Sequence, residues 1–499
     1  MNQASNILTL PTEPRDFGFY LDGGWIASGD REVFERASPA HGVPVTRIPK
    51  CTGDDLNAAV SSARAAFEDR RWSGLSGAER AAVLLRAAAL IRERSEEIAY
   101  YETLENGKPI SQSRGEVEGA ASIYEYAAGA ARSLHGDTFN NLGDKMLGLV
   151  TREPIGVVGL ITPWNFPFFI LAERVPFILA SGCTIVAKPS EVTSATTLLM
   201  AEILTDAGLP AGAFNVVTGS GSEIGQALIE HNDVDMVSFT GSTAVGRRLL
   251  QAATGNFKRL GLELGGKNPQ IVFADANLED AADGVVFGIC FNAGQCCVSG
   301  SRLLVERSVA AEFEALLVKK LSQVRTGDPL DPQTQVGAIT TPAQAKTILR
   351  HLRGGPEEGA RLACGGSVIE TDAGQFIEPT LFSDVTPEMA LASEEIFGPV
   401  LSMQSFGSVG EAVEMANDTE YGLAASIWTK DLDKAVATMR QVQAGRVWVN
   451  TTITGGPEMP IGGFKQSGWG RETGAYGVEE YTQVKSVHIE LGERVHWVS

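Results

Sequence analysis

Two periodicities divide the chain. From Asp54 to about Ala130, apolar residues recur at three-to-four spacing among Ala, Leu, Glu and Arg, which is typical of amphipathic helices. The Asn106-Gly107 pair predicts a helix end within this region, because glycine readily takes the left-handed backbone conformation that closes a helix. Residues 1–50 are polar and contain proline, and they indicate an arm with short strands.

Further along, short apolar runs that end in Gly- or Pro-containing loops alternate with helical stretches. This alternation predicts parallel β-α units and an α/β fold with a doubly wound sheet, in which ligands bind at the carboxyl ends of the strands. The runs lie at 156–163, 183–190, 213–222, 236–242 and 269–276. A second series at 301–308, 425–431 and 445–450 predicts a second α/β domain.

Two other segments, 142–154 and 481–491, alternate like exposed strands. Paired with each other they would form a two-stranded flap. The open edge of such a flap can pair with another chain, so we expect a homodimer or a homotetramer.

Composition narrows the class of protein. Among 499 residues, 43% are hydrophobic and 20% charged, which allows a large core and two or three domains. The net charge of −20 disfavours nucleic acid and anionic lipid as partners, although solubility alone also explains it. The most apolar stretch, 157–183, is interrupted by proline and charged residues and makes a poor membrane span.

The six cysteines form no C-x-x-C pair, so neither a zinc site nor a disulfide framework is expected. The beginning of the chain shows no basic start followed by an apolar run, as a secretory signal would. Both features are consistent with a reducing, cytoplasmic setting and with chemistry that uses no metal.

Two loops of small residues, 218–225 and 239–246, each follow an apolar run. A strand, small residues and then a helix leave free backbone N–H groups where a phosphate can bind, and the Ser242 hydroxyl adds a further donor. Each loop by itself is equally compatible with an ordinary tight turn, because neither has the strict G-x-G-x-x-G spacing.

Residues 261–268 match the phosphate-binding pattern of P-loop enzymes except at the last position. Asn268 stands where Ser or Thr should hold Mg²⁺, and the glycines are expected to follow a charged helix instead of a strand. A P-loop NTPase therefore stays only an alternative.

Gly294-Gln295-Cys296-Cys297 is a candidate nucleophile motif. Neighbouring cysteines are not expected to face one pocket, so at most one would be the nucleophile; alternatively both are small buried apolar residues. The six histidines lie in unrelated contexts, and without an obvious histidine base a carboxylate base is favoured.

Two polar side chains lie in rigid surroundings. Glu263 lies in a glycine-flanked polar stretch, where it is either a base or a solvated carboxylate. Asn165 lies between Pro163 and Pro167, where its amide is either an oxyanion donor or part of a structural turn.

Together these motifs resemble the aldehyde dehydrogenase superfamily, hydrolytic type, from about residue 20 to residue 490. Seven pieces occur in family order, and the segment PEMPIGGFKQSG is similar to that of betaine-aldehyde and aminoaldehyde dehydrogenases. The pieces are ITPWNFP (161–167), AKPSE (187–191), FTGS (239–242), LELGGKNP (262–269), FNAGQCCVSGSR (291–302), EEIFGPV (394–400) and GGFKQSGWGRE (462–472).

The resemblance implies a role for each catalytic position. Cys297 would attack the aldehyde, Asn165 would stabilise the oxyanion, and hydride transfer to NAD⁺ would leave a thioester. Glu263 would then activate the hydrolytic water. Lys188 and Glu472 complete the catalytic set that the resemblance implies.

The resemblance also implies a Rossmann-like domain for NAD. Glu191 beside the adenosine ribose would disfavour the 2′-phosphate of NADP, although Lys188 offsets part of this effect. The implied cofactor contacts are Ile161, Thr162, Pro163, Trp164, Lys188, Ser190, Glu191, Gly221, Gly225, Phe239, Thr240, Gly241, Ser242, Val245, Glu263, Leu264, Gly265, Glu395 and Phe397. The implied division is 1–134 with 155–263 for NAD, 264–477 for catalysis, and 135–154 with 478–499 for oligomerisation.

The aldehyde itself stays open. Glu173 or Glu458 would suit a cationic aldehyde, Arg174 would suit an acidic semialdehyde, and pairing among these charges would say nothing about substrate. The implied substrate contacts are Phe166, Phe169, Glu173, Val298, Glu458 and Ile461. A semialdehyde or other polar-aldehyde dehydrogenase that tolerates NADP is one alternative function, and a cysteine hydrolase that needs no NAD is another.

Overall fold

The computed structural model describes residues 9–371, 373–494 and 496–498. Its α-helices are α1 (Gly53–Glu68), α2 (Gly77–Glu93), α3 (Ser95–Asn106), α4 (Ile110–Ser133), α5 (Pro167–Ala172), α6 (Val175–Ser181), α7 (Ala195–Asp206), α8 (Gln226–Glu230), α9 (Thr243–Ala252), α10 (Leu278–Cys290), α11 (Ala310–Leu321), α12 (Pro342–Glu358), α13 (Ala390–Ser393), α14 (Val409–Asn417), α15 (Leu432–Met439) and α16 (Gly474–Glu480). A π-helical turn, η1 (Gly221–Gly225), and a 3-10 turn, η2 (Phe291–Gly294), add to these.

The strands form two large sheets and four small ones. They are β1 (Arg15–Asp16), β2 (Phe19–Leu21), β3 (Gly24–Ile26), β4 (Val33–Ala37), β5 (Pro44–Pro49), β6 (Asp137–Phe139), β7 (Met146–Pro154), β8 (Val157–Ile161), β9 (Thr184–Lys188), β10 (Phe214–Val216), β11 (Met236–Thr240), β12 (Arg259–Glu263), β13 (Pro269–Val272), β14 (Arg302–Glu306), β15 (Arg361–Cys364), β16 (Val368–Glu370), β17 (Gln375–Ile377), β18 (Thr380–Ser383), β19 (Val400–Phe406), β20 (Tyr421–Gly422), β21 (Ala424–Trp428), β22 (Arg446–Val449), β23 (Phe464–Lys465), β24 (Gly468–Trp469) and β25 (Thr482–Glu490).

The first large sheet has the order β24-β12-β11-β8-β9-β10-β2-β3, and its five strands from β12 to β10 run parallel. Successive residues of a strand face opposite sides, so each strand serves two cores. Val158 packs on one face with helices α2, α4, α6 and α7, whereas Val157 packs on the other with helix α1. Helices therefore cover both faces, which makes this a doubly wound sheet.

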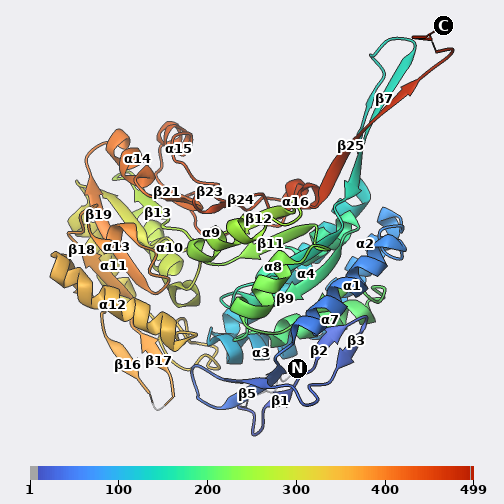
Figure 1. Ribbon diagram of the computed structural model, residues 1–499. Coiled ribbons are helices and arrows are strands. Elements are labelled where there is room, and N and C mark those ends of the chain that lie inside the picture. Colours follow the sequence, from blue (N-terminus) through green and yellow to red (C-terminus); the bar gives the residue numbers. More distant parts are fainter. Residues whose placement is uncertain (1–8, 372, 495, 499) are drawn as a thin grey trace, which may run out of the picture.

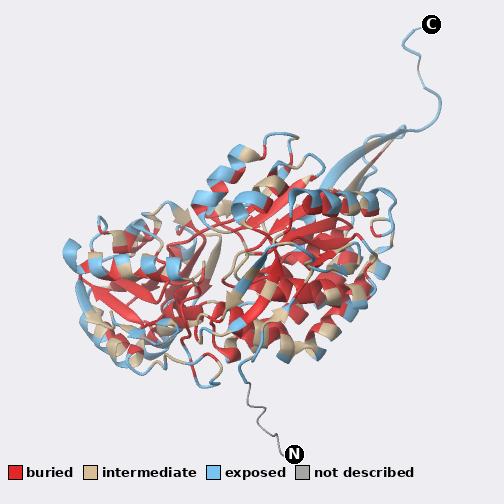
Figure 2. Cartoon of the chain, turned by 60° about the horizontal axis from the view of Figure 1, so that its bottom comes forward, coloured by how far each residue is buried: buried red, intermediate tan, exposed pale blue. Residues whose placement is uncertain are grey.

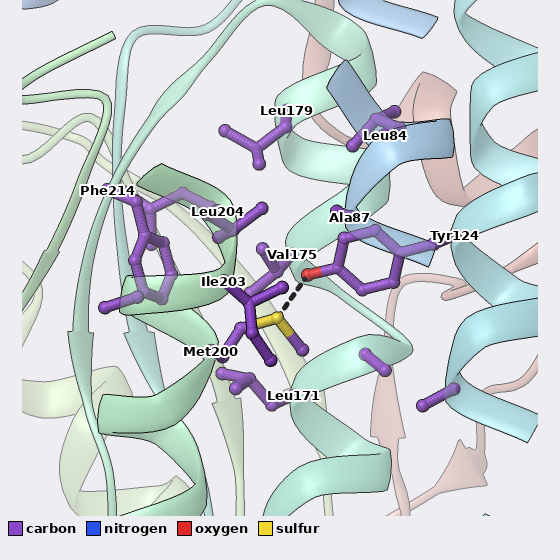
Figure 3. Close-up of a cluster of buried hydrophobic side chains, with 14 of the residues drawn as sticks. Leu84, Ala87, Tyr124, Leu171, Val175, Leu179, Met200, Ile203, Leu204 and Phe214 are labelled. Carbon is purple, nitrogen blue, oxygen red and sulfur yellow. Dashed lines mark hydrogen bonds between the residues drawn. The ribbon is translucent and has the colours of Figure 1, made fainter. Parts of the chain in front are cut away.

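Figure 3 shows part of the first core, where side chains from α2, α4, α6 and α7 meet Phe214 of β10. Tyr124 is fully buried there, and its hydroxyl donates a hydrogen bond to the Met200 sulfur at 3.0 Å. The partner matters because a buried hydroxyl without one costs free energy.

The second large sheet has the order β15-β18-β19-β14-β13-β21-β22, and its strands from β18 to β22 run parallel. Helices α10, α11 and α12 pack on one face and α14 on the other. Figure 1 shows the two sheets in separate lobes of the molecule. The expected α/β class with parallel sheets is confirmed.

The two segments with exposed alternation form the predicted flap. β25 pairs with β7 in antiparallel register over nine residue pairs from Thr482–Pro154 to Glu490–Met146, and β6 adds a third strand that the sequence did not suggest. The flap projects from the body in Figure 1, and Figure 2 shows it largely exposed. No helix of the described chain is long and apolar enough to cross a membrane.

One expectation was wrong. Gly265 and Gly266 follow strand β12 and not a charged helix. The charged residues that suggested a helix, Lys258 and Arg259, lie before and at the start of this strand, and β12 pairs with β11 in parallel. Leu260 and Leu262 are two residues apart and both face the sheet's core, and this two-residue spacing is typical of a strand.

Candidate active site

The two large sheets contribute opposite strand ends to one site. Strands β8, β9, β11 and β12 of the first sheet contribute residues at their carboxyl ends. In the second sheet, the candidate residues lie before β13, β14 and β19, at the amino ends. Two hydrogen bonds join the two sides: the Gly266 N–H donates to Glu395 at 2.9 Å, and the Asn165 amide donates to the Gln295 carbonyl at 3.1 Å.

A constrained turn presents the cysteines. Asn292 and Ala293 have φ of 48° and 53°, and Gly294 has φ of 69°, all in the left-handed region. A Cβ on Gly294 would lie 2.1 Å from the Gly398 carbonyl oxygen, so only glycine fits. Such backbone persists only when its surroundings hold it, and here Asn268 binds the following loop through the carbonyls of Cys297 and Ser299.

The cysteines line a cavity of about 570 Å³. Both Cys296 and Cys297 line it, so the expectation that neighbouring cysteines cannot share a pocket was wrong; the left-handed turn before them departs from the extended backbone that would separate them. A hydrogen bond with Cys296, together with burial, raises the pKa of the Cys297 thiol well above its ordinary value. The resting thiol is therefore protonated and needs a base.

Glu263 is the last residue of β12 and is buried. Its Oε1 has no hydrogen-bond partner among the described residues. Burial raises the pKa of its carboxyl well above the ordinary value, Arg174 opposes the rise, and the nearby groups of Glu472 and Cys297 add to it. A buried carboxyl with a raised pKa can take a proton near neutral pH, as a general base must.

A buried charge cluster lies beside Glu263. Arg174 is 3.6 Å from Glu472 and 3.5 Å from Glu173, which are looser than ideal ion pairs. Tyr481 donates its hydroxyl hydrogen bond to Glu472 at 2.8 Å. Burial raises the pKa of both Glu472 and Glu173. The carboxyls of Glu173, Glu472 and Glu263 thus share the one guanidinium of Arg174. This shortage of positive charge favours the protonated form of at least one of the three.

Asn165 holds its loop to the cysteine turn. Asn106 and Asn292 donate to its backbone carbonyl at 3.3 Å and 2.7 Å, and its own amide donates to Gln295. The side-chain NH₂ carries a second N–H, which makes it a donor available for a developing oxyanion.

The residues expected around the adenosine lie after β9 and in η1. Lys188 is buried, and its ammonium is 3.4 Å from the half-exposed Glu191 carboxylate. A Cβ on Gly225 would lie 4.0 Å from the Lys188 side chain, so η1 packs against it. Ser242 caps helix α9 by accepting from the Val245 N–H, which leaves backbone donors at a helix start.

Further residues expected to contact the cofactor meet across the two sheets. Glu395 accepts from Gly266, and the ring of Phe397 lies 5.5 Å from that of Trp164, edge to face. Burial raises the pKa of Glu395 to about 7. A Cβ on Gly265 would lie 2.3 Å from this carboxylate, so a glycine is needed there.

Five of the six expected substrate residues line the cavity: Phe166, Phe169, Glu173, Val298 and Ile461. Glu458 is exposed and does not line it, and Arg174 is buried and does not line it either. The other expected cofactor residues lie at strand ends and in the segments that follow the strands of the first sheet, with Gly221 in η1 and Val245 in α9: Ile161, Thr162, Pro163, Ser190, Gly221, Phe239, Thr240, Gly241, Val245 and Leu264.

Sequence reasoning missed four polar residues of the site. Lys108 bridges Glu102 and Glu116 at 3.1 Å and 2.6 Å and lies 4.3 Å from the Phe166 ring centre. Arg446 lines the cavity with Glu116, and Asn268 ties the cysteine loop. Arg446 could have been suspected from the sequence, because it is a charged residue at the start of the apolar strand GRVWVN. Nothing in their local sequence distinguishes the other three residues.

Comparisons with known proteins agree along most of the chain. A sequence model of the aldehyde dehydrogenase family matches residues 25–487. The betaine aldehyde dehydrogenase of Bacillus subtilis (strain 168) is 39% identical over 472 residues, which are 94% of this chain and 96% of that protein.

Solved structures are similar to the same extent. An NAD-dependent aldehyde dehydrogenase from Sinorhizobium meliloti has a TM-score of 0.96 at 49% identity, covering 97% of both chains. An indole-3-acetaldehyde dehydrogenase in complex with NAD⁺ has a TM-score of 0.94 at 43% identity, again covering 97% of both.

Proposed function

The chain belongs to the aldehyde dehydrogenase family, and from this premise we propose which of its residues carry each step of NAD-dependent aldehyde oxidation. The reaction converts an aldehyde to the carboxylic acid. The observation that carries the proposal is that Cys297 lines the cavity of about 570 Å³ described above, while Glu263, whose Oε1 has no hydrogen-bond partner among the described residues, interacts electrostatically with Cys297.

Cys297 is the nucleophile, and Cys296 is not. Both thiols line the cavity, and Cys297 is the one that contributes to the raised pKa of Glu263. Proton transfer from the thiol to the Glu263 carboxylate gives a thiolate, which adds to the aldehyde carbon. The second N–H of Asn165 then stabilises the alkoxide; losing such a donor typically costs about 10²–10³ in rate.

When bound, NAD⁺ supplies the acceptor for the hydride that leaves the thiohemiacetal carbon. The residues present fit a dinucleotide: Glu191 is placed to accept ribose hydroxyls, Ser242 begins helix α9 where a pyrophosphate binds, and Glu395 accepts from ribose or backbone donors beside Phe397. The carboxylate of Glu191 disfavours a 2′-phosphate, which supports NAD over NADP.

Glu263 completes the reaction. The proton that Glu263 took from the Cys297 thiol first passes to solvent, which restores the carboxylate. After the thioester has formed on Cys297, the Glu263 carboxylate takes a proton from water as the water oxygen bonds to the acyl carbon, the C–S bond breaks, and the acid and the Cys297 thiolate separate. The neighbouring Arg174 and Glu472 tune the pKa of Glu263 from opposite directions.

Two further parts of the proposal rest on the flap and on the cysteines. Its β25 edge is exposed along most of its length and includes Val484 and Ile489, so we infer that it pairs with another copy of the chain in a homo-oligomer. The six cysteines are free in the structure, which suits a reducing, cytoplasmic compartment.

The test compares the two neighbouring thiols. Cys297→Ala should abolish NADH formation, measured by nicotinamide absorbance with a neutral aldehyde, whereas Cys296→Ala should keep most of it. The matched pair controls for disturbance of the turn. Equal activity of the two variants would refute the assignment, and aldehyde-independent hydrolysis of an ester without NAD⁺ as the sole activity would favour a cysteine hydrolase.

A further inference from the structure

The charged groups that line the cavity are unequally compensated. Two carboxyls, Glu116 and Glu173, and one guanidinium, Arg446, lie in its wall. Each carboxyl has a buried cation beside it, Lys108 at 2.6 Å from Glu116 and Arg174 at 3.5 Å from Glu173. The remaining oxygen of Glu116, Oε1, has no partner but is inaccessible to solvent. Neither carboxyl is therefore free to take a cationic ligand.

Arg446 differs from both. No carboxylate of the described chain lies within 4.0 Å of its guanidinium, although Glu173 and Cys297 act on it electrostatically from beyond that distance. The guanidinium donates one hydrogen bond, to the Thr454 carbonyl at 3.2 Å. The guanidinium lies 5.0 Å from the ring centre of Trp448, which orients it. A Cβ on Gly455 would lie 2.5 Å from its Nη2, so a glycine makes room for it. The fold thus holds a cation in the cavity wall with donors unused.

We propose that Arg446 is an anion subsite, and that the substrates of this enzyme are aldehydes whose distal end bears a carboxylate. The inference rests on the proposed function, since it places the aldehyde carbon at Cys297. A guanidinium presents a planar fork of N–H donors that matches a carboxylate, and burial strengthens the pairing. The apolar walls, which include Phe169, Phe291 and Ile461, contact the alkyl chain between the two ends.

The two substrate hypotheses drawn from the sequence use other charged residues than Arg446. Glu173 was one candidate partner for a cationic aldehyde, but it already lies 3.5 Å from Arg174 and also interacts electrostatically with Arg446. Arg174 was the candidate partner for an acidic semialdehyde, but it is buried, does not line the cavity and contacts both Glu173 and Glu472. The anion-binding role therefore passes to Arg446, the unpaired cation that faces the cavity.

The test measures kcat/KM with NAD⁺ for three aldehyde series of four to eight carbons: ω-oxocarboxylates, n-alkanals and ω-aminoaldehydes. At the best-fitting length, the carboxylate should exceed the alkanal by about 10- to 100-fold, as expected for a hydrogen bond to a charged group. Arg446→Gln should remove this ratio, and Arg446→Lys should retain part of it. Arg440→Gln, the same change at an exposed arginine on the surface, should leave the ratio unchanged.

A second measurement requires no catalysis. Dicarboxylates of matched length should protect the Cys297 thiol from iodoacetamide more than monocarboxylates do, and Arg446→Gln should abolish the difference. A wild-type carboxylate ratio near or below one, an aminoaldehyde preference, or a ratio that Arg446→Gln leaves intact would overturn the anion subsite. Failure of every aldehyde to yield NADH would instead refute the proposed function itself.

Discussion

The two large sheets are alike in architecture but contribute to the site from opposite ends. In the first sheet, Asn165 and Lys188 to Glu191 follow β8 and β9, and Glu263 ends β12. In the second sheet, Cys297 precedes β14, Glu395 precedes β19 and Arg446 begins β22. Ligands of an open parallel sheet ordinarily bind at the carboxyl ends of its strands. Only the first sheet follows that rule.

The second sheet completes the site that the first sheet begins. The amino ends of the second sheet face the carboxyl ends of the first, and the contacts Gly266 to Glu395 and Asn165 to Gln295 join them. A substrate between the sheets would thus be reached from both sides, and the proposed nucleophile comes from the second sheet while the proposed base comes from the first.

The largest effect is expected for Glu263, the proposed base at the end of strand β12 in the first sheet. Glu263→Gln removes general-base catalysis, typically about 10²–10⁴-fold, and should slow acid release more than the first hydride transfer. Rapid-mixing measurements should show a surviving or larger NADH burst.

Glu306→Gln is the matched control, because Glu306 is likewise the last residue of a parallel strand but accepts from the Ala274 N–H in the second sheet. Its turnover should stay near wild type. Loss of the burst in Glu263→Gln, with an intact thiol titre, would contradict the assignment of the base to the first sheet.

A second variant tests the amino ends of the second sheet. Asn268→Ala deletes hydrogen bonds to Cys297 and Ser299 and leaves the buried Ala424 N–H without its 2.9 Å acceptor. The free energy of unfolding should fall by about 2–4 kcal/mol in denaturant titrations. Asn140→Ala, at an exposed loop position, should change it by less than about 0.5 kcal/mol; equal losses would mean that Asn268 does not hold the loop.

Helix caps offer a closer comparison of the two sheets. Ser242 caps α9 after a strand of the first sheet, and Ser408 caps α14 after a strand of the second, each by accepting from an N–H three residues on. Either Ser→Ala change should cost about 1 kcal/mol of stability. Only Ser242→Ala should also raise KM for NAD⁺, by about 10-fold. A similar KM rise in Ser408→Ala would remove the distinction.

The smallest effect concerns pH. Burial, with a contribution from Glu472, raises the pKa of Glu263, so the active carboxylate is lost as pH falls at a higher pH than for an exposed glutamate. Glu472→Gln should lower that pKa and move the acidic limb of the kcat profile to lower pH.

At the wild-type midpoint, where half of Glu263 is ionised, the gain from Glu472→Gln is at most about twofold. Glu479→Gln, at an exposed residue that pairs with Arg152, should leave the limb in place. A limb that moves to higher pH in Glu472→Gln would show that Glu472 acts on Glu263 in some other way.

Much of the fold could be predicted from local pattern. The helices from α1 to α4, the parallel strands and the β7–β25 pair follow from periodicity, because burial on one face or two imposes a matching spacing on the sequence. The strand β12 was mistaken for a helix, because its charged start masked the alternation of Leu260 and Leu262. The division into domains and the roles of the site residues stay predictions.

What the sequence determined by itself is the family, the α/β class and the identity of the chemical groups, since motifs such as LELGG and GQCC fix residue types and order. Only the tertiary structure decided how those groups meet: that both cysteines share one cavity, that the second sheet presents its amino ends, and that Arg174 compensates Glu173 while Arg446 stays unpaired. The physical reason is that a charge is specified by one residue, whereas its compensation depends on every charged group that folding brings within a few ångströms.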